Sequence, residues 1–120
     1  MKIGYVQTSP VFGDKEKNLD EVRRQTLGVR ADLLVLPELF ATGYAFTSRD
    51  EAEAMAETAE GPTAAMLMEI SQQSGAVVVA GYIERENGRL YNAALMVSGK
   101  GVIGNYRKIH LFNKEKLWFD

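Results

Sequence analysis

The chain has 120 residues, 46% of them hydrophobic and 25% charged, a balance that is typical of one folded domain and excludes a disordered or fibrous protein. The formal charge is −2 and no long basic or acidic block occurs, so nothing indicates a nucleic-acid or membrane partner. Zero cysteines and a single histidine, His110, exclude disulfides and thiolate or histidine-rich metal sites, and we expect neither a metal nor a cofactor.

The first residues predict a short strand and no targeting sequence. Ile3, Tyr5 and Val6 form an apolar stretch that ends at Ser9-Pro10, as strands do before turn residues. The basic start, apolar stretch and small-residue cleavage site of a signal peptide do not appear, and no segment approaches the ~18 apolar residues of a membrane span. We therefore expect a cytoplasmic protein.

The next segment predicts an amphipathic helix. Asp14 can cap this helix, because aspartate is a favoured N-cap residue. Side chains suited to a core then recur at helical spacing, so one face should be buried. These side chains are Leu19, Val22, Thr26 and Leu27.

A strand and two helices are expected next. Residues 33–36 are a continuous apolar run too short for a helix, which predicts a strand buried on both faces, and Pro37 should end its ladder. The alanine-rich residues 50–59 favour a helix. Gly61-Pro62-Thr63 should break it and start another, which ends at Gly75. The side chains expected to face inward from that second helix are Met66, Leu67 and Ile70.

The last third of the chain predicts an antiparallel meander. Residues 76–82 are a second apolar run, and Asn87-Gly88 is a favoured two-residue hairpin turn, so residues 90–97 should run antiparallel to them. A turn at Gly99-Lys100-Gly101 then leads to a strand over residues 102–109. Strands alternate with helices in the first part of the chain and form a meander in the last part. This order predicts a single α/β domain with a mixed sheet and helices on one face.

Glu38 is the first candidate for chemistry. It directly follows the strand over residues 33–36 and Pro37, and ligands of open α/β sheets bind outside the carboxyl ends of the strands. A carboxyl group held against apolar neighbours has a raised pKa, which suits proton transfer. The alternative is a solvated acid that caps a helix or pairs with a lysine, and position alone leaves both open.

Lys108 is the second candidate. Alternation along residues 102–109 places Tyr106, Lys108 and His110 on one face of the strand. A lysine turned inward could stabilise a developing oxyanion, and such a donor is typically worth ~100- to 1,000-fold in rate. Most lysines on strands instead protect a sheet edge, and this alternative is favoured when the residue is taken alone.

Gly99, Gly101 and Gly104 match the G-x-G-x-x-G pattern of dinucleotide-binding loops. That motif has to open a helix whose N-terminus holds the phosphates, whereas these glycines join two β-rich segments. We therefore expect a turn here rather than a nucleotide site. His110 has no cluster of further ligands, so no metal site is predicted.

Taken together, these segments resemble the nitrilase superfamily of carbon-nitrogen hydrolases. Residues 34–44, with Leu-Val-Leu-Pro-Glu-Leu-Phe followed by Thr-Gly-Tyr, look like the family motif around its catalytic glutamate. Residues 104–112, Gly-Asn-Tyr-Arg-Lys-Ile-His-Leu-Phe, look like the segment around its catalytic lysine. Segments 3–7, 79–81 and 90–94 fall in the family's usual order, so the resemblance covers essentially the whole chain.

The resemblance implies roles for three residues. Glu38 would be the general base and later the acid, Lys108 would stabilise the tetrahedral intermediate, and Glu115 would help to position the substrate and the catalytic groups. Taken alone, Glu115 would be a surface acid among lysines, so only the resemblance singles it out. The implied reaction is hydrolysis of a small amide, N-carbamoyl group or nitrile through a thioester.

The family's nucleophile is a cysteine beyond the lysine motif, and residues 1–120 contain none. We therefore expect an incomplete carbon-nitrogen hydrolase domain, the first half of an α-β-β-α sandwich, which is inactive by itself. The alternative is a short non-catalytic homologue that acts as a binding or assembly module. For the full-length protein the resemblance implies a small-molecule substrate and a homodimer or larger homo-oligomer.

Four aromatic residues could line a pocket or an interface, although aromatic side chains more often belong to the core. They are Phe40, Tyr44, Phe46 and Trp118. Of these, Tyr44 and Phe46 are the candidate substrate-binding residues.

Overall fold

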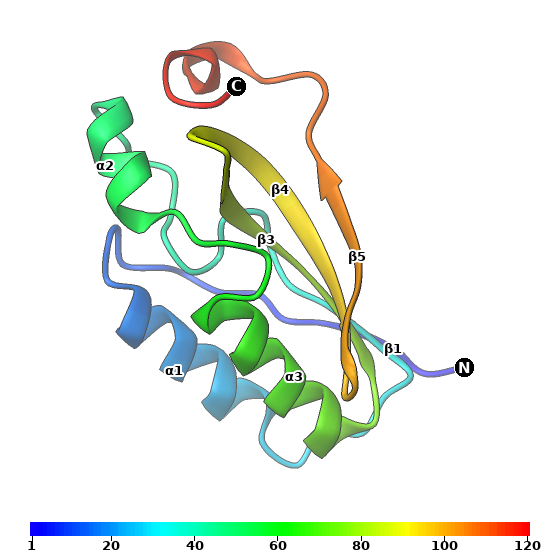
Figure 1. Cartoon of the computed structure of the whole chain (residues 1–120). Coiled ribbons are helices and arrows are strands. Elements are labelled where there is room, and N and C mark those ends of the chain that lie inside the picture. The colour runs from blue at the N-terminus through cyan, green and yellow to red at the C-terminus, as the bar shows by residue number, and fades with distance from the viewer.

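In the computed structural model, which describes residues 1–120, two helices cover one face of a twisted sheet (Figure 1). In chain order the elements are β1 (Ile3–Tyr5), α1 (Lys15–Thr26), β2 (Leu33–Val35), α2 (Arg49–Met55), α3 (Pro62–Ser74), β3 (Val77–Glu86), β4 (Arg89–Ser98), β5 (Gly101–Arg107) and the 3₁₀ helix η1 (Asn113–Leu117). Every element expected from the sequence is present. No helix has the length and apolar character that crossing a bilayer requires.

The five strands form one mixed sheet in the order β1-β2-β3-β4-β5. The first three strands are parallel, with Tyr5 opposite Val35 and Val35 opposite Val79. The last three form the expected antiparallel meander. Asn87 and Gly88 join β3 to β4 with φ angles of 52° and 76°, the left-handed conformation that a tight hairpin turn requires. The α/β class predicted from the sequence is confirmed.

The helices α1 and α3 bury their apolar stripes against one face of the sheet (Figure 1). Val22 of α1 and Leu67 of α3 are fully buried and pack in one cluster with Leu34 and Val78 of the sheet. Burying a side chain of this size is worth roughly 1.5–3 kcal/mol. This layer is therefore the main core, and it fixes the strands whose ends carry the candidate site.

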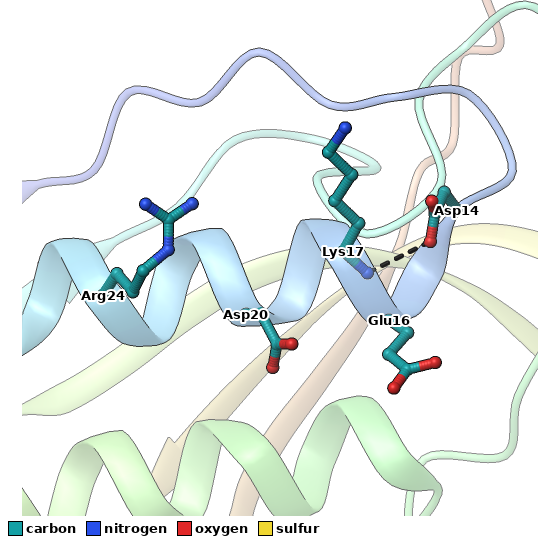
Figure 2. Close-up of a pocket in the computed structure, with 5 residues that line it drawn as sticks. All are labelled: Asp14, Glu16, Lys17, Asp20 and Arg24. Carbon is teal, nitrogen blue, oxygen red and sulfur yellow. Dashed lines mark hydrogen bonds between the residues drawn. The ribbon is translucent and has the colours of Figure 1, made fainter.

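The ends of α1 and α3 follow from their capping residues. The Asp14 carboxylate accepts a hydrogen bond from the backbone N–H of Lys17 at 3.1 Å (Figure 2), as an N-cap residue does. Gly75 ends α3 with a φ of 77°, as predicted. Leu27 was expected to face inward, but it is 77% exposed, because α1 ends at Thr26 and Leu27 has an extended backbone.

The face of the sheet opposite α1 and α3 is apolar and partly exposed, and we call it the open face. The prediction that the second strand is buried on both sides was wrong: Leu34 is 3% exposed but Val35 is 38% exposed. The reason is that both helices pack on the Leu34 side. The large exposed apolar side chains of the open face are Ile3, Tyr5, Val35, Met96 and Tyr106.

A second apolar cluster closes the end of the β3–β4 hairpin, where α2 and η1 lie (Figure 1). Phe46, from the loop before α2, packs against Trp118 and Phe119 with ring centroids 6.3 and 6.1 Å apart. These rings belong to one cluster with Ile83 and Leu90 of the hairpin. The contacts hold the segment after β5 over the end of the sheet.

Candidate active site

Four polar side chains from distant parts of the chain meet at one end of the sheet. Glu38 follows β2, Asn92 lies near the start of β4, Lys108 directly follows β5, and Glu115 lies in η1. Because β4 runs antiparallel to β3, its start lies at the same end of the sheet as the ends of β2 and β5. Sheet topology alone therefore brings Glu38, Asn92 and Lys108 together.

The four side chains form a closed ring in which two donors alternate with two carboxylates. Lys108 Nζ lies 3.0 Å from Glu38 Oε1 and 2.9 Å from Glu115 Oε2. On the other side, Asn92 Nδ2 donates to Glu38 Oε1 at 2.5 Å and to Glu115 Oε1 at 2.8 Å. The structure thus brings together all three residues singled out from the sequence, Glu38, Lys108 and Glu115. It adds Asn92 to them.

Glu38 is held by its neighbours in the chain. The Leu36 N–H donates to Val79 O at 2.8 Å, which continues the β2–β3 pairing up to Pro37. Leu39 then has a φ of 47°, a conformation that is uncommon for leucine. Its side chain is 1% exposed in the second cluster, so packing supports this conformation and sets the direction in which Glu38 leaves the sheet.

Lys108 and Glu115 are fixed by the segment that leaves β5. The strand was expected to reach residue 109, but it ends at Arg107, and the Lys108 N–H makes one more bond to Asn92 O at 2.8 Å. Glu115 was expected on the surface if taken alone, but it is 8% exposed. The chain turns back at Asn113, which has a φ of 48°, and the Phe112 N–H donates to Glu115 Oε2 at 2.6 Å.

The ring holds Glu38 ionised and Lys108 charged. Burial raises the pKa of Glu38, but hydrogen bonds with Tyr44, Lys108 and Asn92 outweigh it, and the pKa lies below the usual 4.5. The expectation of a raised pKa was therefore wrong, because donors face this carboxylate. A hydrogen bond to Glu115 is the largest cause that raises the pKa of Lys108 above 10.5. Burial and Glu38 raise the pKa of Tyr44, so its hydroxyl stays neutral.

Two hollows adjoin the ring. One, of about 220 Å³, lies on the open face and is lined in part by Leu36, Glu38, Gly81, Asn92, Tyr106 and Lys108. The other, of about 200 Å³, is lined in part by Tyr44, Phe46, Phe112, Glu115, Trp118 and Phe119. Three of the four aromatic residues predicted to line a pocket are therefore in the second hollow. Phe40 is not, because it is 1% exposed within the main core.

Residues 2–119 match the sequence model of the family described as carbon-nitrogen hydrolase. The chain belongs to the carbon-nitrogen hydrolase family. A nitrilase from Pyrococcus abyssi is 40% identical over 124 residues, which cover 100% of this chain and 47% of the nitrilase. An (R)-stereoselective amidase from a Pseudomonas species is 34% identical, over 97% of this chain and 42% of the amidase.

The fold is also that of solved carbon-nitrogen hydrolases. The crystal structure of an N-terminal amidase superposes with a TM-score of 0.88 at 28% identity, and the match covers 98% of this chain and 30% of the amidase chain. The resemblance to the nitrilase superfamily is confirmed. The chain spans less than half the length of the relatives that it matches.

Other features of this carbon-nitrogen hydrolase chain do not form a comparable site. His110 is exposed, and no group of three His, Asp or Glu side chains is placed to hold a metal ion. Gly99, Gly101 and Gly104 lie in the β4–β5 turn and in β5, as expected, and open no helix. A charged hollow runs along α1 and is lined by Asp14, Glu16, Lys17, Asp20 and Arg24, whose side chains are spread along the helix (Figure 2).

Asn92 and Gly81 are the site residues that the sequence did not single out. A single asparagine in a strand, here between Tyr91 and Ala93, carries no signal of its own, and the face on which it lies becomes known only with the strand register. A glycine inside a strand can mark a close approach of another segment, and Gly81 faces the backbone of Glu38. That signal was available in the sequence, but the partner segment could not be read from it.

Proposed function

We propose that the chain is the N-terminal part of an enzyme that hydrolyses a small non-peptide carbon-nitrogen bond, in an amide, N-carbamoyl group or nitrile. The observation that supports this proposal most is the position of Lys108, whose ammonium group lies between the carboxylates of Glu38 and Glu115 at 3.0 and 2.9 Å. An ionised base beside a fixed positive charge is what acyl transfer through a covalent intermediate requires. Family membership and the amidase relative are consistent with it.

In the proposed reaction the nucleophile is a cysteine thiol from sequence beyond residue 120. With an amide or N-carbamoyl substrate, Glu38 takes the thiol proton, and the sulfur attacks the carbonyl carbon. The electron pair of the carbonyl bond moves to oxygen, and Lys108 stabilises the resulting oxyanion, a contribution typically worth ~100- to 1,000-fold in rate. Collapse of this intermediate expels the amine, which leaves with the proton held by Glu38, and a thioester remains.

The second half-reaction uses the same residues. Glu38 takes a proton from water, and the hydroxide formed attacks the thioester carbon. Lys108 again faces the oxyanion, and the thiolate leaves and recovers the proton from Glu38, so that acid is released and the enzyme is regenerated. Glu115 acts on this cycle through Lys108, which it holds in place at 2.9 Å. No cofactor or metal is needed for these steps.

We further propose that Tyr44 and Phe46 bind the substrate within the second hollow. Their hollow is small, about 200 Å³, and is lined by aromatic side chains together with polar groups, among them Glu115. Sites for small molecules combine apolar walls with a few placed polar groups. A substrate with a compact apolar group next to its carbonyl carbon fits this description.

The rest of the domain, in this proposal, supplies the cysteine and a second sheet that covers the open face. The open face presents large apolar side chains, among them Tyr5 at 80% and Met96 at 42% exposed. Apolar surface of this kind is stabilised when it is buried. The full-length enzyme would be a cytoplasmic homodimer or larger homo-oligomer acting on a small molecule, with no nucleic-acid or membrane partner.

The test compares full-length wild-type protein with Glu38→Gln, using release of ammonia or amine from a panel of small amides, carbamoyl compounds and nitriles. We expect Glu38→Gln to lower hydrolysis by at least about 100-fold and to abolish the thioester mass seen for wild type under rapid quench. Glu16→Gln, at an exposed position in the first turn of α1, is the control and should keep wild-type rates. Unchanged hydrolysis in Glu38→Gln would remove Glu38 from the mechanism.

The reading frame beyond residue 120 gives a second test. A cysteine at the start of a helix after an apolar strand is expected there. A stop codon immediately after residue 120 would instead favour a non-catalytic binding or assembly module.

A further inference from the structure

Asn92 is a buried polar residue near the start of β4, at the end of the sheet where the ring lies. It lies on β4 opposite Ile83 of β3, and only 3% of it is exposed. A buried amide costs free energy unless its hydrogen bonds are made. Its neighbours along β4, Tyr91 and Ala93, point to the opposite face of the sheet. The polar groups that meet the Asn92 side chain therefore come from other segments of the chain.

The side chain of Asn92 contacts both carboxylates of the ring through a single nitrogen. Nδ2 lies 2.5 Å from Glu38 Oε1 and 2.8 Å from Glu115 Oε1, so each of its two hydrogens faces one carboxylate. The reverse orientation of the amide would point an oxygen at two negative groups. The backbone carbonyl of Asn92 also accepts from the Lys108 N–H at 2.8 Å. Asn92 is thus bonded to all three other members of the ring.

The charge of the ring explains why a neutral donor stands here. Two carboxylates and one ammonium leave one excess negative charge, and two carboxylates that share a site disfavour each other's ionisation. Lys108 can lie between them on one side only. A second cation on the other side would neutralise the site and weaken Glu38 as a base, whereas an amide binds both carboxylates without adding charge.

We propose that Asn92 is a positioning residue that holds Glu38 and Glu115 at a fixed separation around Lys108. This inference rests on the proposed function for its catalytic meaning, but the geometry itself lies entirely within residues 38–115. Asn92 and Lys108 both donate to Oε1 of Glu38. The other oxygen, Oε2, is then the atom that takes the proton from the thiol. Without Asn92, Lys108 and the Tyr44 hydroxyl are the side-chain donors left to Glu38, so its carboxylate is held less firmly and Oε2 loses part of its fixed direction.

The first measurement is the titration of Glu38 in the full-length protein, followed by carbon-13 NMR of the side-chain carboxyl group. The charged and titratable groups that face Glu38 are Lys108, Glu115 and Tyr44. Asn92→Leu removes the donor at similar size, and Asn92→Asp keeps the shape but adds a third carboxylate. We expect both variants to titrate Glu38 at higher pH than wild type, with the larger shift in Asn92→Asp.

Asn105→Leu is the matched control. Asn105 also donates from a strand amide to a carboxylate, Glu84 Oε1 at 2.9 Å, but on the opposite face of the sheet. The Asn105→Leu variant should leave the midpoint of the Glu38 titration unchanged. If Asn92→Leu does not give a folded amide spectrum, Asn92→Asp decides the question. The same Glu38 midpoint in wild type and in the folded Asn92 variants would overturn the inference.

The second measurement separates this inference from the proposed function. In the full-length enzyme we expect Asn92→Leu to lower kcat by roughly 100-fold, as misplacement of a catalytic group does, with little change in KM. The acidic limb of its pH–rate profile should move to higher pH, as the titration of Glu38 does. If wild type hydrolyses nothing but the NMR shifts are present, the proposed function fails and the assignment of Asn92 to the ring stands. A full-length Asn92→Leu enzyme with wild-type kcat and pH profile would contradict the positioning role.

Discussion

Gly81 of β3 faces the backbone of Glu38 so closely that no side chain fits between them. A Cβ at position 81 would lie 2.6 Å from Glu38 Cα and 2.8 Å from Leu39 N. These are backbone atoms, which cannot move aside as the end of a flexible side chain can. We therefore expect Gly81→Ala to displace the Glu38 segment and to lower the free energy of unfolding by about 1–3 kcal/mol, measured by urea denaturation.

Gly104→Ala is the control for this prediction. Gly104 also lies in a strand and faces the same side of the sheet, but a Cβ there would lie 3.5 Å from Met96 Cβ, an ordinary contact. Its stability should stay within about 0.5 kcal/mol of wild type. In the full-length enzyme Gly81→Ala should also lose hydrolysis, whereas Gly104→Ala should keep it. Equal stabilities for the two variants would contradict the close approach seen at Gly81.

The partly buried ion pair that joins α1 to the segment before α3 predicts a stability effect. Lys15 Nζ lies 2.6 Å from Glu57 Oε2, and the side chain of Glu57 is 7% exposed. Glu57 also accepts from the Thr63 N–H at 2.7 Å. Lys15→Met should leave the buried carboxylate of Glu57 without its cation. We expect the free energy of unfolding, measured by urea denaturation, to fall by about 2–3 kcal/mol. This is at or just below the usual cost of breaking a buried ion pair, because Thr63 still donates to Glu57.

The exposed pair between Arg24 and Glu21 is the control for Lys15→Met. Both side chains lie on the solvent side of α1, at 74% and 37% exposure. Arg24→Met should therefore cost less than about 1 kcal/mol. A similar cost for Lys15→Met and Arg24→Met would show that Glu57 is not dependent on its partner.

Acid should destabilise the fold through Glu38. Its pKa in the folded protein lies below the usual 4.5, so the unfolded chain binds this proton more readily. The stabilisation is then fully present above about pH 4.5 and is lost as pH falls through the folded value. Glu38→Gln should flatten this part of a plot of unfolding free energy against pH, and Glu16→Gln should not.

Asp120 contributes to acid sensitivity at lower pH. A hydrogen bond from Arg49 at 2.7 Å, together with one from the Leu90 N–H, holds its pKa below 3.8. The same sign applies, so its stabilisation is lost as pH falls below about 3.8. A residual acid transition that persists in Glu38→Gln is therefore expected, and it should weaken in Asp120→Asn.

The open face predicts self-association of the 120-residue chain. Tyr5 and Met96 are large, exposed side chains on the same face, and contiguous apolar surface of this kind promotes association. Tyr5→Lys combined with Met96→Lys should lower the weight-average mass in sedimentation equilibrium. Leu27→Lys, at a position 77% exposed at the end of α1, adds one lysine on the helix side and should leave the mass unchanged. A monomeric wild-type chain would contradict this prediction.

Local signals in the sequence were sufficient for most of the fold. Asp14, Gly75 and the pair Asn87-Gly88 mark boundaries because each has a backbone or side-chain chemistry that one kind of position demands. The errors concern tertiary relations. The strand over residues 33–36 was expected to be buried on both faces, because an apolar run does not say which side of a strand the helices cover. Here α1 and α3 both cover the Leu34 side, so Val35 on the other side is exposed.

The candidate site was harder to predict than the fold. Glu38 and Lys108 stand next to predicted strand ends, so their proximity could be argued from topology together with the family resemblance. Glu115 lies among lysines, and its burial depends on the turn at Asn113 and on the aromatic cluster beneath it. The prediction that the pKa of Glu38 is raised was wrong. The direction of the shift depends on hydrogen bonds with Asn92 and Tyr44, and these contacts are known only from the three-dimensional structure.

The span of the ring along the chain has a consequence for biosynthesis. Its closing contact joins Glu38 to Lys108, 70 residues apart, and such long-range contacts form late because the intervening loop must be ordered first. While the ribosome is still making β5, Glu38 has already emerged and still lacks the ammonium group of Lys108, which follows β5. The nascent protein therefore acquires its charged centre only after β5 has been made.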